Sequence, residues 1–197
     1  MRFQLATIGP TARPGHATLT APPNGPCRMT ASIDSHEHDE TPGKADRAGF
    51  GSRRSYVGRK AGARRLGASL WEVPAGEAAY PYHFHLGEEE LLVVLSGPGQ
   101  LRTPAGWRTL AQGEVVSFLP GEDGAHQVVA GEAPLRFLAI STNGAPDLVV
   151  YPDSGKLGAF ERRPDGGGVW ELYRRGDRVD YWDGEEPPAP PAPATLP

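Results

Sequence analysis

The middle of the chain is built from short apolar runs that alternate with polar turns. The runs LGASLWEVP, ELLVVLSG, WRTL, EVVSFLP, AHQVVA and LRFLAIST have the length and residue types of β-strands. Stretches such as PAGE, GPGQ, AQGE and PGEDG separate them and are typical of turns. A spacing of roughly 8–12 residues per unit predicts an all-β sandwich or barrel. Nothing between residues 66 and 142 has a persuasive helical period.

One strand differs from the others because it is apolar at consecutive positions. The run LLVVL, residues 91–95, offers side chains to both faces of a sheet. We therefore expect both faces of this strand to be covered, by a second sheet or by a partner subunit.

The two ends of the chain lack any such pattern. Residues 1–49 are rich in Pro, Gly, Thr and Ala and show no period of a strand or helix, and residues 186–197 form a Pro-rich tail. We expect both segments to be disordered, and residues 50–185 to form the folded domain with flanking arms. Met29 lies inside the first segment, so translation could begin there instead of at Met1.

Composition narrows the class of protein further. The chain has a net charge of −4 and a single cysteine, so neither a broad surface for nucleic acid or membrane nor an intramolecular disulfide is expected. No apolar run is long enough for a signal peptide or a membrane span, which favours a cytoplasmic protein. The densest basic stretch is expected to be a solvated or self-docking arm; it contains Arg53, Arg54, Arg59, Lys60, Arg64 and Arg65.

Candidate chemistry gathers in YPYHFHLGEEE, residues 80–90. Residues i and i+2 of a strand point to the same side, so His83 and His85 should project together. A short hairpin could return Glu90 beside them, and His126 opens another strand after the loop PGEDGA. Three imidazoles and one carboxylate that converge in a small barrel would bind a divalent first-row metal. The alternative is an ordinary pair of hydrogen-bonded strand histidines.

A second His-x-His pair serves as a control for this argument. His36 and His38 lie among Asp, Glu, Pro and Gly, with no strand pattern around them. We expect no metal at this upstream pair, because the spacing alone carries little information.

Residues 76–97 resemble the first sequence motif of the cupin superfamily. That motif has a Gly, a His-x-His, a Glu and a closing Gly, which here are Gly76, His83 with His85, Glu90 and Gly97. Six residues separate Gly76 from His83, one more than is usual in the family. Six residues separate Glu90 from Gly97, as in the family, and this favours Glu90 over Glu89 as the motif carboxylate.

A second stretch resembles the other cupin motif. Gly113, Pro120-Gly121 and His126 match its Gly, its turn and its His, with one extra residue before the His. Ala130 stands where the family usually has Asn, which removes a supporting group but no metal ligand. The similarity to small bacterial single-domain cupins continues through YPDSGKLG and YRRGDRVDYWDGE, and covers most of residues 50–185.

The resemblance implies a double-stranded β-helix, the jelly-roll barrel of the cupins, with one divalent metal such as Fe, Mn, Ni or Zn. By their motif positions the implied ligands are His83, His85, Glu90 and His126. Metal binding should fall as pH drops through the histidine range near ~6.5.

The implied function is metal-dependent chemistry of the dioxygenase or isomerase type on a small polar or anionic metabolite. The alternative is a non-catalytic module that binds or senses a small molecule. Small cupins often dimerise, so we also expect a homodimer.

Overall fold

The computed structural model describes residues 30–34, 37–39, 47–144, 146–161 and 168–187. Within these residues the fold is all-β, as predicted, with a single four-residue α-helix, α1 (Val57–Lys60). The parts of the predicted disordered segments at 1–29, 35–36, 40–46 and 188–197 lie outside the described residues. None of the described helices has the length and apolar character needed to span a bilayer.

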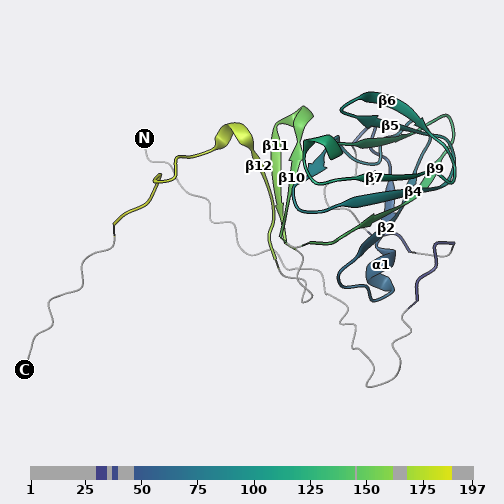
Figure 1. Ribbon diagram of the computed structural model, residues 1–197, viewed down its shortest axis with the longest axis horizontal. Helices are drawn as coiled ribbons and strands as arrows, with labels where there is room; N and C mark the ends of the chain where they lie inside the picture. Colours follow the sequence, from purple (N-terminus) through teal and green to yellow (C-terminus); the bar gives the residue numbers. More distant parts are fainter. Residues whose placement is uncertain (1–29, 35–36, 40–46, 145, 162–167, 188–197) are drawn as a thin grey trace, which may run out of the picture.

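A five-stranded and a three-stranded sheet form the barrel (Figure 1). The larger sheet has the strand order β1 (Arg53–Ser55), β2 (Gly67–Val73), β9 (Leu135–Ser141), β4 (Glu90–Ser96), β7 (Val115–Phe118). The smaller sheet has the order β6 (Gly106–Leu110), β5 (Gly99–Thr103), β8 (Gln127–Ala130). All pairings are antiparallel, and all six predicted runs form strands of these two sheets.

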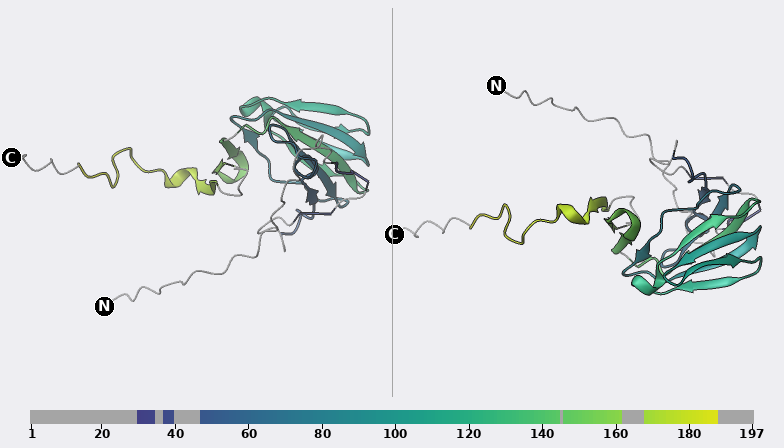
Figure 2. Two further views of the ribbon diagram at one scale, coloured as in Figure 1. Left: turned by 90° about the horizontal axis from the view of Figure 1, so that it is seen from below. Right: turned by 90° about the horizontal axis from the view of Figure 1, so that it is seen from above.

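A third sheet stands beside the barrel. Its order is β12 (Trp170–Arg174), β11 (Lys156–Phe160), β10 (Asp147–Tyr151), β3 (Phe84–His85). Three 3₁₀ turns complete the fold: η1 (Glu122–Gly124), η2 (Pro152–Ser154) and η3 (Arg175–Asp177). In both views of Figure 2, the residues that follow β12 lead away from the barrel.

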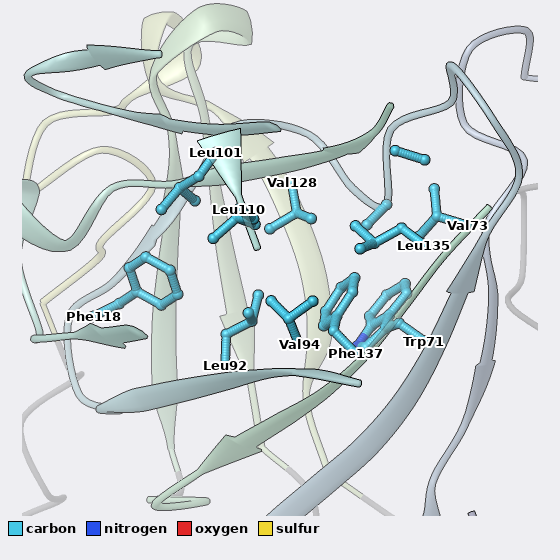
Figure 3. Packing of buried hydrophobic residues seen from close by; sticks show 12 residues of the cluster. Trp71, Val73, Leu92, Val94, Leu101, Leu110, Phe118, Val128, Leu135 and Phe137 are labelled. Carbon is cyan, nitrogen blue, oxygen red and sulfur yellow. The ribbon is translucent and has the colours of Figure 1, made fainter. Parts of the chain in front are cut away.

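The hydrophobic core lies between the two barrel sheets (Figure 3). Leu101, Leu110 and Val128 of the smaller sheet face Leu92 and Val94 of β4. The strand period of two explains this pattern, because alternate residues of β4 point inward.

The prediction for the opposite face of β4 holds only in part. Leu91, Val93 and Leu95 are partly exposed, whereas Leu92 and Val94 are each 1% exposed. In the described structure, the outer face of this strand is therefore less completely covered than the core face.

Two predicted turn glycines have backbone angles that favour glycine. Gly113 has a φ of +81° and Gly97 a φ of +87°. A Cβ at Gly97 would also lie 2.1 Å from the carbonyl oxygen of Pro134, so no side chain fits there without a shift of the backbone.

One predicted connection is wrong. Residues 83–85 and β4 do not form a hairpin, because β3 pairs with β10 while β4 pairs with β7 and β9. The residues between β3 and β4 cross from one sheet to another, and this crossing still delivers Glu90 to the histidines.

Candidate metal centre

His83 and His126 are held side by side by their own backbones. The amide of His83 donates to the carbonyl of His126 at 3.1 Å, and the amide of His126 donates to that of His83 at 2.9 Å. This antiparallel bridge brings together residues from the two motifs, and their ring centroids are 4.8 Å apart. Two of the four predicted site residues therefore lie side by side.

The same two imidazoles have a fixed tautomer. The Nδ1 of His83 lies 2.9 Å from the carbonyl oxygen of Pro81, and the Nδ1 of His126 lies 3.0 Å from that of Gly124. A carbonyl only accepts, so Nδ1 carries the proton and Nε2 keeps a free lone pair. Burial lowers the pKa of His83 well below its usual value and that of His126 to about 4. Both rings are therefore neutral at physiological pH.

His85 is oriented by a carboxylate instead. Its Nδ1 donates to Oδ2 of Asp147 at 2.5 Å, and the other oxygen of Asp147 accepts the amide of Gly87 at 3.0 Å. Burial lowers the pKa of His85, but the Asp147 hydrogen bond and the charges of Glu90 and Asp147 outweigh it, and the net pKa is raised. Nε2 of His85 then points away from Asp147, toward Glu90.

Glu90 lies between two of the imidazoles. Its Oε2 is 3.4 Å from Nε2 of His85 and 3.4 Å from Nε2 of His126. Glu90 is paired with Phe118 across β4 and β7, and the ring of Phe118 stacks on His126 at 3.7 Å. This stacking fixes His126 against the carboxylate.

Three of the four predicted ligands form one cluster and the fourth adjoins it. Donor atoms of His83, Glu90 and His126 all lie within 4.8 Å of one another. His85 belongs to a second such group with Glu88 and Asp147, and it adjoins the first group through Glu90.

Glu88 and Glu89, the two glutamates that precede Glu90, differ in their exposure to solvent. Glu89, the competing carboxylate, is exposed, and its amide donates to Thr142 Oγ1 at 3.2 Å. Glu88 is 5% exposed and Asp147 is 4% exposed, and neither was predicted to belong to the site. Asp147 comes 62 residues after His85 in a strand of another sheet, so no local spacing could indicate it.

The donor set fits a divalent metal ion. The imidazoles of His83 and His126 are neutral and present Nε2 rather than Nδ1. The imidazole of His85 is hydrogen-bonded to a buried carboxylate, an arrangement that typically orients metal-bound histidines. One glutamate supplies the negative charge. Imidazole nitrogen combined with carboxylate oxygen suits first-row ions of the kind expected from the sequence.

Of the upstream histidine pair, the structure describes His38 only. Its Nε2 lies 3.2 Å from Oε2 of Glu72 on β2. His36 lies outside the described residues.

Comparison with known proteins decides the family. Residues 69–141 match the model of the cupin domain. A protein of Acidithiobacillus ferrooxidans, named provisionally as a sugar phosphate isomerase, is 31% identical; the match covers 65% of this chain and 80% of that chain, with a TM-score of 0.56. The chain belongs to the cupin superfamily.

A second solved structure supports the cupin fold. The sugar phosphate isomerase of Silicibacter pomeroyi, also a cupin, is 22% identical over 77% of this chain and 96% of its own, with a TM-score of 0.64. No curated protein matches the sequence significantly. Cupins often bind a metal, and the candidate ligand groups described above are consistent with that.

One departure from the cupin motif is explained by the core. Ala130, which replaces the usual Asn, is 3% exposed and packs within the hydrophobic cluster, while its amide donates to the carbonyl of Glu77. An apolar residue therefore suits this position, and none of the four predicted ligands is affected.

Two tyrosines also line the histidine cluster of this cupin. The ring of Tyr80 meets those of His83 and His126 edge-on at 4.9 and 5.6 Å, and the ring of Tyr151 is stacked near His83 at 5.9 Å. Burial raises the pKa of both phenols. The charge of Glu90 adds to this effect for Tyr80, and that of Asp147 adds to it for Tyr151. Both hydroxyls therefore stay protonated.

Proposed function

We propose that this cupin is a metal-dependent enzyme of the isomerase type that acts on a small anionic metabolite, with sugar phosphates as the first class to test. The observation that carries the proposal is the convergence of His85 and His126, through Nε2, on one oxygen of Glu90. The 31% identity with a protein provisionally named a sugar phosphate isomerase supports the reaction class.

The proposed ligands are His83, His85, Glu90 and His126. A divalent ion bound there would supply Lewis-acid polarisation of a carbonyl or hydroxyl oxygen. The protein's own part is to keep the imidazoles deprotonated at Nε2 and correctly oriented. Pro81 and Gly124 do this through their carbonyls, and Asp147 does it through its carboxylate.

Tyr80 and Tyr151 are placed to donate hydrogen bonds at the wall of the site. A hydrogen bond from a phenol would orient a substrate oxygen beside the metal ligands. The raised pKa of each phenol means that its hydroxyl is available as a donor to a substrate oxygen. Within the described residues, neither hydroxyl is engaged in a hydrogen bond with the protein.

Lys156 supports the choice of an anionic substrate. Its ammonium lies 5.1 Å from the centre of the Tyr151 ring, and that ring in turn is stacked near His83. In the described structure Lys156 has no carboxylate partner, whereas Arg102 is held by both oxygens of Asp153 at 2.6 and 3.0 Å. Lys156 is thus the cation best placed to meet a phosphate at the site.

The test is a screen of the metal-analysed protein with aldose and ketose phosphates in D2O. Solvent-derived deuterium at the carbon next to the carbonyl, seen by NMR, would support isomerase chemistry. Lys156→Met should raise KM for the phosphorylated substrate about tenfold and leave the metal content unchanged. Arg108→Met, which removes an exposed cation paired with Glu114, is the matched control.

Three results would contradict the proposal in different ways. Oxygen consumption with substrate loss would identify a dioxygenase instead. Saturable binding of sugar phosphates without turnover would identify a binding or sensing module. Absence of bound metal in the folded protein would remove the basis of the proposal altogether.

A further inference from the structure

The residues that follow β11 form a projecting segment with large exposed apolar side chains. We call residues 170–187 the β12 arm; every one of them is exposed. Its large apolar side chains range from 47% to 82% exposed, and they are Trp170, Leu172, Tyr173, Val179, Tyr181 and Trp182. Apolar surface of this extent, when it is contiguous, usually marks a protein interface.

Among the described residues, the arm contacts its own chain at β11, where the ring centroid of Trp170 lies 4.4 Å from that of Phe160. Strand β12 is an edge strand, bonded on one side to β11. Beyond Arg175, whose amide donates to Gly155, the described hydrogen bonds of the arm join residues of the arm itself, as between Asp183 and Asp180 or Trp182 and Asp180. Figure 2 shows the arm leading away from the barrel in both views.

The arm is also acidic. Residues 177–186 contain five acidic side chains and one basic side chain, Arg178. A partner surface for the arm should therefore combine positive charge with apolar area.

Such a surface exists on this chain, in the loop after α1. We call residues 59–66, the last two residues of α1 and the loop that follows, the basic loop; it contains Arg59, Lys60, Arg64 and Arg65 and no acidic residue, and Lys60 is paired with Asp39. Leu66 at its end is 58% exposed. Arg65, Leu66 and Thr142 line a surface hollow of about 370 Å³, which offers apolar contact beside a guanidinium. An aromatic ring in that hollow would gain both hydrophobic and cation–π contact.

We propose that the β12 arm docks on the basic loop of a second copy of this chain, so that two copies exchange arms in a two-fold dimer. Each copy carries both halves of the contact, acidic and aromatic on the arm, basic and apolar on the loop. When each of two copies places its arm on the loop of the other, the pair has two-fold symmetry. The sequence predicts that this basic stretch is a solvated or self-docking arm; in the present proposal it is the surface that receives the arm of a second copy.

The exchange would also bear on the metal centre. The arm begins in the sheet β12–β11–β10–β3, whose strands β10 and β3 carry Asp147 and His85. A partner that holds the arm holds the outer edge of this sheet. The proposal itself rests only on the arm and the loop, and it stands whether or not the metal assignment does.

The experiment is a charge-reversal exchange on the full chain, followed by light scattering. One variant carries Asp183→Lys with Glu185→Lys on the arm, and the other carries Arg64→Glu with Arg65→Glu on the loop. All four side chains are exposed, so both variants should fold, as circular dichroism and an unchanged metal content would confirm. We expect a wild-type dimer at micromolar concentration and monomers for each variant alone. Mixing the two variants should restore the dimer, because each arm then meets a loop of opposite charge.

The mixture separates exchange between copies from docking within one chain. If the arm bound the loop of its own chain, mixing the two variants would not restore the contact between arm and loop. Only a single chain that carries all four substitutions would then regain this contact. Trp182→Ser should raise the dimer dissociation constant at least tenfold. Trp107→Ser, at a 57% exposed tryptophan on β6, is the matched control and should leave it unchanged. A monomeric wild type, or variants that stay dimeric, would overturn the proposal.

Discussion

The centre of this cupin is defined by which nitrogen each histidine presents. His83, His85 and His126 all use Nδ1 to contact the protein, two through backbone carbonyls and one through Asp147. Each Nε2 is thereby left for another partner. The sequence could predict the residue types and the second motif, because both depend on local spacing. It could not predict Asp147, because this partner is brought in by the pairing of β10 with β3.

Removal of any one proposed ligand should release the metal. We expect His83→Ala, His85→Ala, Glu90→Ala and His126→Ala each to lose at least nine-tenths of the bound ion, since a site with three ligands binds a dication much more weakly. Glu89→Ala is the matched control and should retain it, because Glu89 is exposed and faces away from the cluster. His36→Ala with His38→Ala should also retain it. Metal content per folded subunit is the measurement.

The pH dependence of metal binding should be set by His85. Imidazolium cannot bind a metal, and the pKa of His85 is raised while those of His83 and His126 are lowered. As pH falls, His85 takes up a proton first. Affinity should therefore begin to fall above pH 6.5, earlier than an unperturbed histidine would imply. Calorimetric titration with the metal at a series of pH values would show this.

The Asp147→Asn substitution tests whether Asp147 is the cause of the raised pKa of His85. The substitution removes the charge and the hydrogen bond that raise the pKa of His85, so the midpoint of metal binding should move to lower pH. The affinity at pH 8 should also fall, about tenfold or more, because the ring loses its supporting carboxylate. A midpoint that stays in place would show that Asp147 does not control the protonation of His85. Glu89→Gln is the control.

At the level of strands, the pattern of apolar residues predicted the positions of the strands correctly. The turn signals predicted the positions of the turns less accurately. All six predicted runs form strands, but GPGQ was taken as a turn although Gly99 and Gln100 begin β5. Glycine suits this strand position because a Cβ at Gly99 would lie 3.0 Å from a Leu135 methyl carbon. The predicted hairpin failed for a different reason: the sequence shows that two strands are close along the chain, but not which sheets they join.

The alternation of β4 leads to a stability prediction. Leu92 is 1% exposed in the core, whereas Val115 on the adjacent strand β7 is 57% exposed. Leu92→Ala should lower the free energy of unfolding by about 2–5 kcal/mol, through lost burial and the cavity that remains. Val115→Ala should change it by less than about 0.5 kcal/mol. Urea unfolding followed by tryptophan fluorescence measures both, and equal losses would contradict the inward orientation of Leu92.

At the scale of the whole molecule, described residues before the predicted boundary contact the folded domain. A boundary at residue 50 was predicted because the preceding residues lack any strand or helix pattern. Asp39 nevertheless pairs with Arg54: its amide donates to the Arg54 carbonyl at 2.7 Å. Single polar contacts of this kind leave no periodic signal in a sequence. The position of the domain boundary thus becomes a matter for experiment.

Two shortened chains would locate that boundary. A chain that begins at residue 30 keeps the contacts of Asp39, whose carboxylate accepts the amide of Tyr56 at 2.7 Å and lies 3.2 Å from the ammonium of Lys60. A chain that begins at residue 50 loses them and leaves the edge strand β1 without its bridge to Asp39. The two lost hydrogen bonds of Asp39 are worth about 1 kcal/mol each or somewhat more, and this should lower Tm by several degrees.

The comparison has an internal control. Asp39→Ala in the chain that begins at residue 30 should reproduce only part of the loss, because it removes the side-chain contacts with Tyr56 and Lys60 but keeps the backbone hydrogen bond to Arg54. Metal content should be the same in all three proteins, since this segment makes no described contact with the histidine cluster. Equal Tm values for the chains that begin at residues 30 and 50 would return the boundary to residue 50, where the sequence pattern places it.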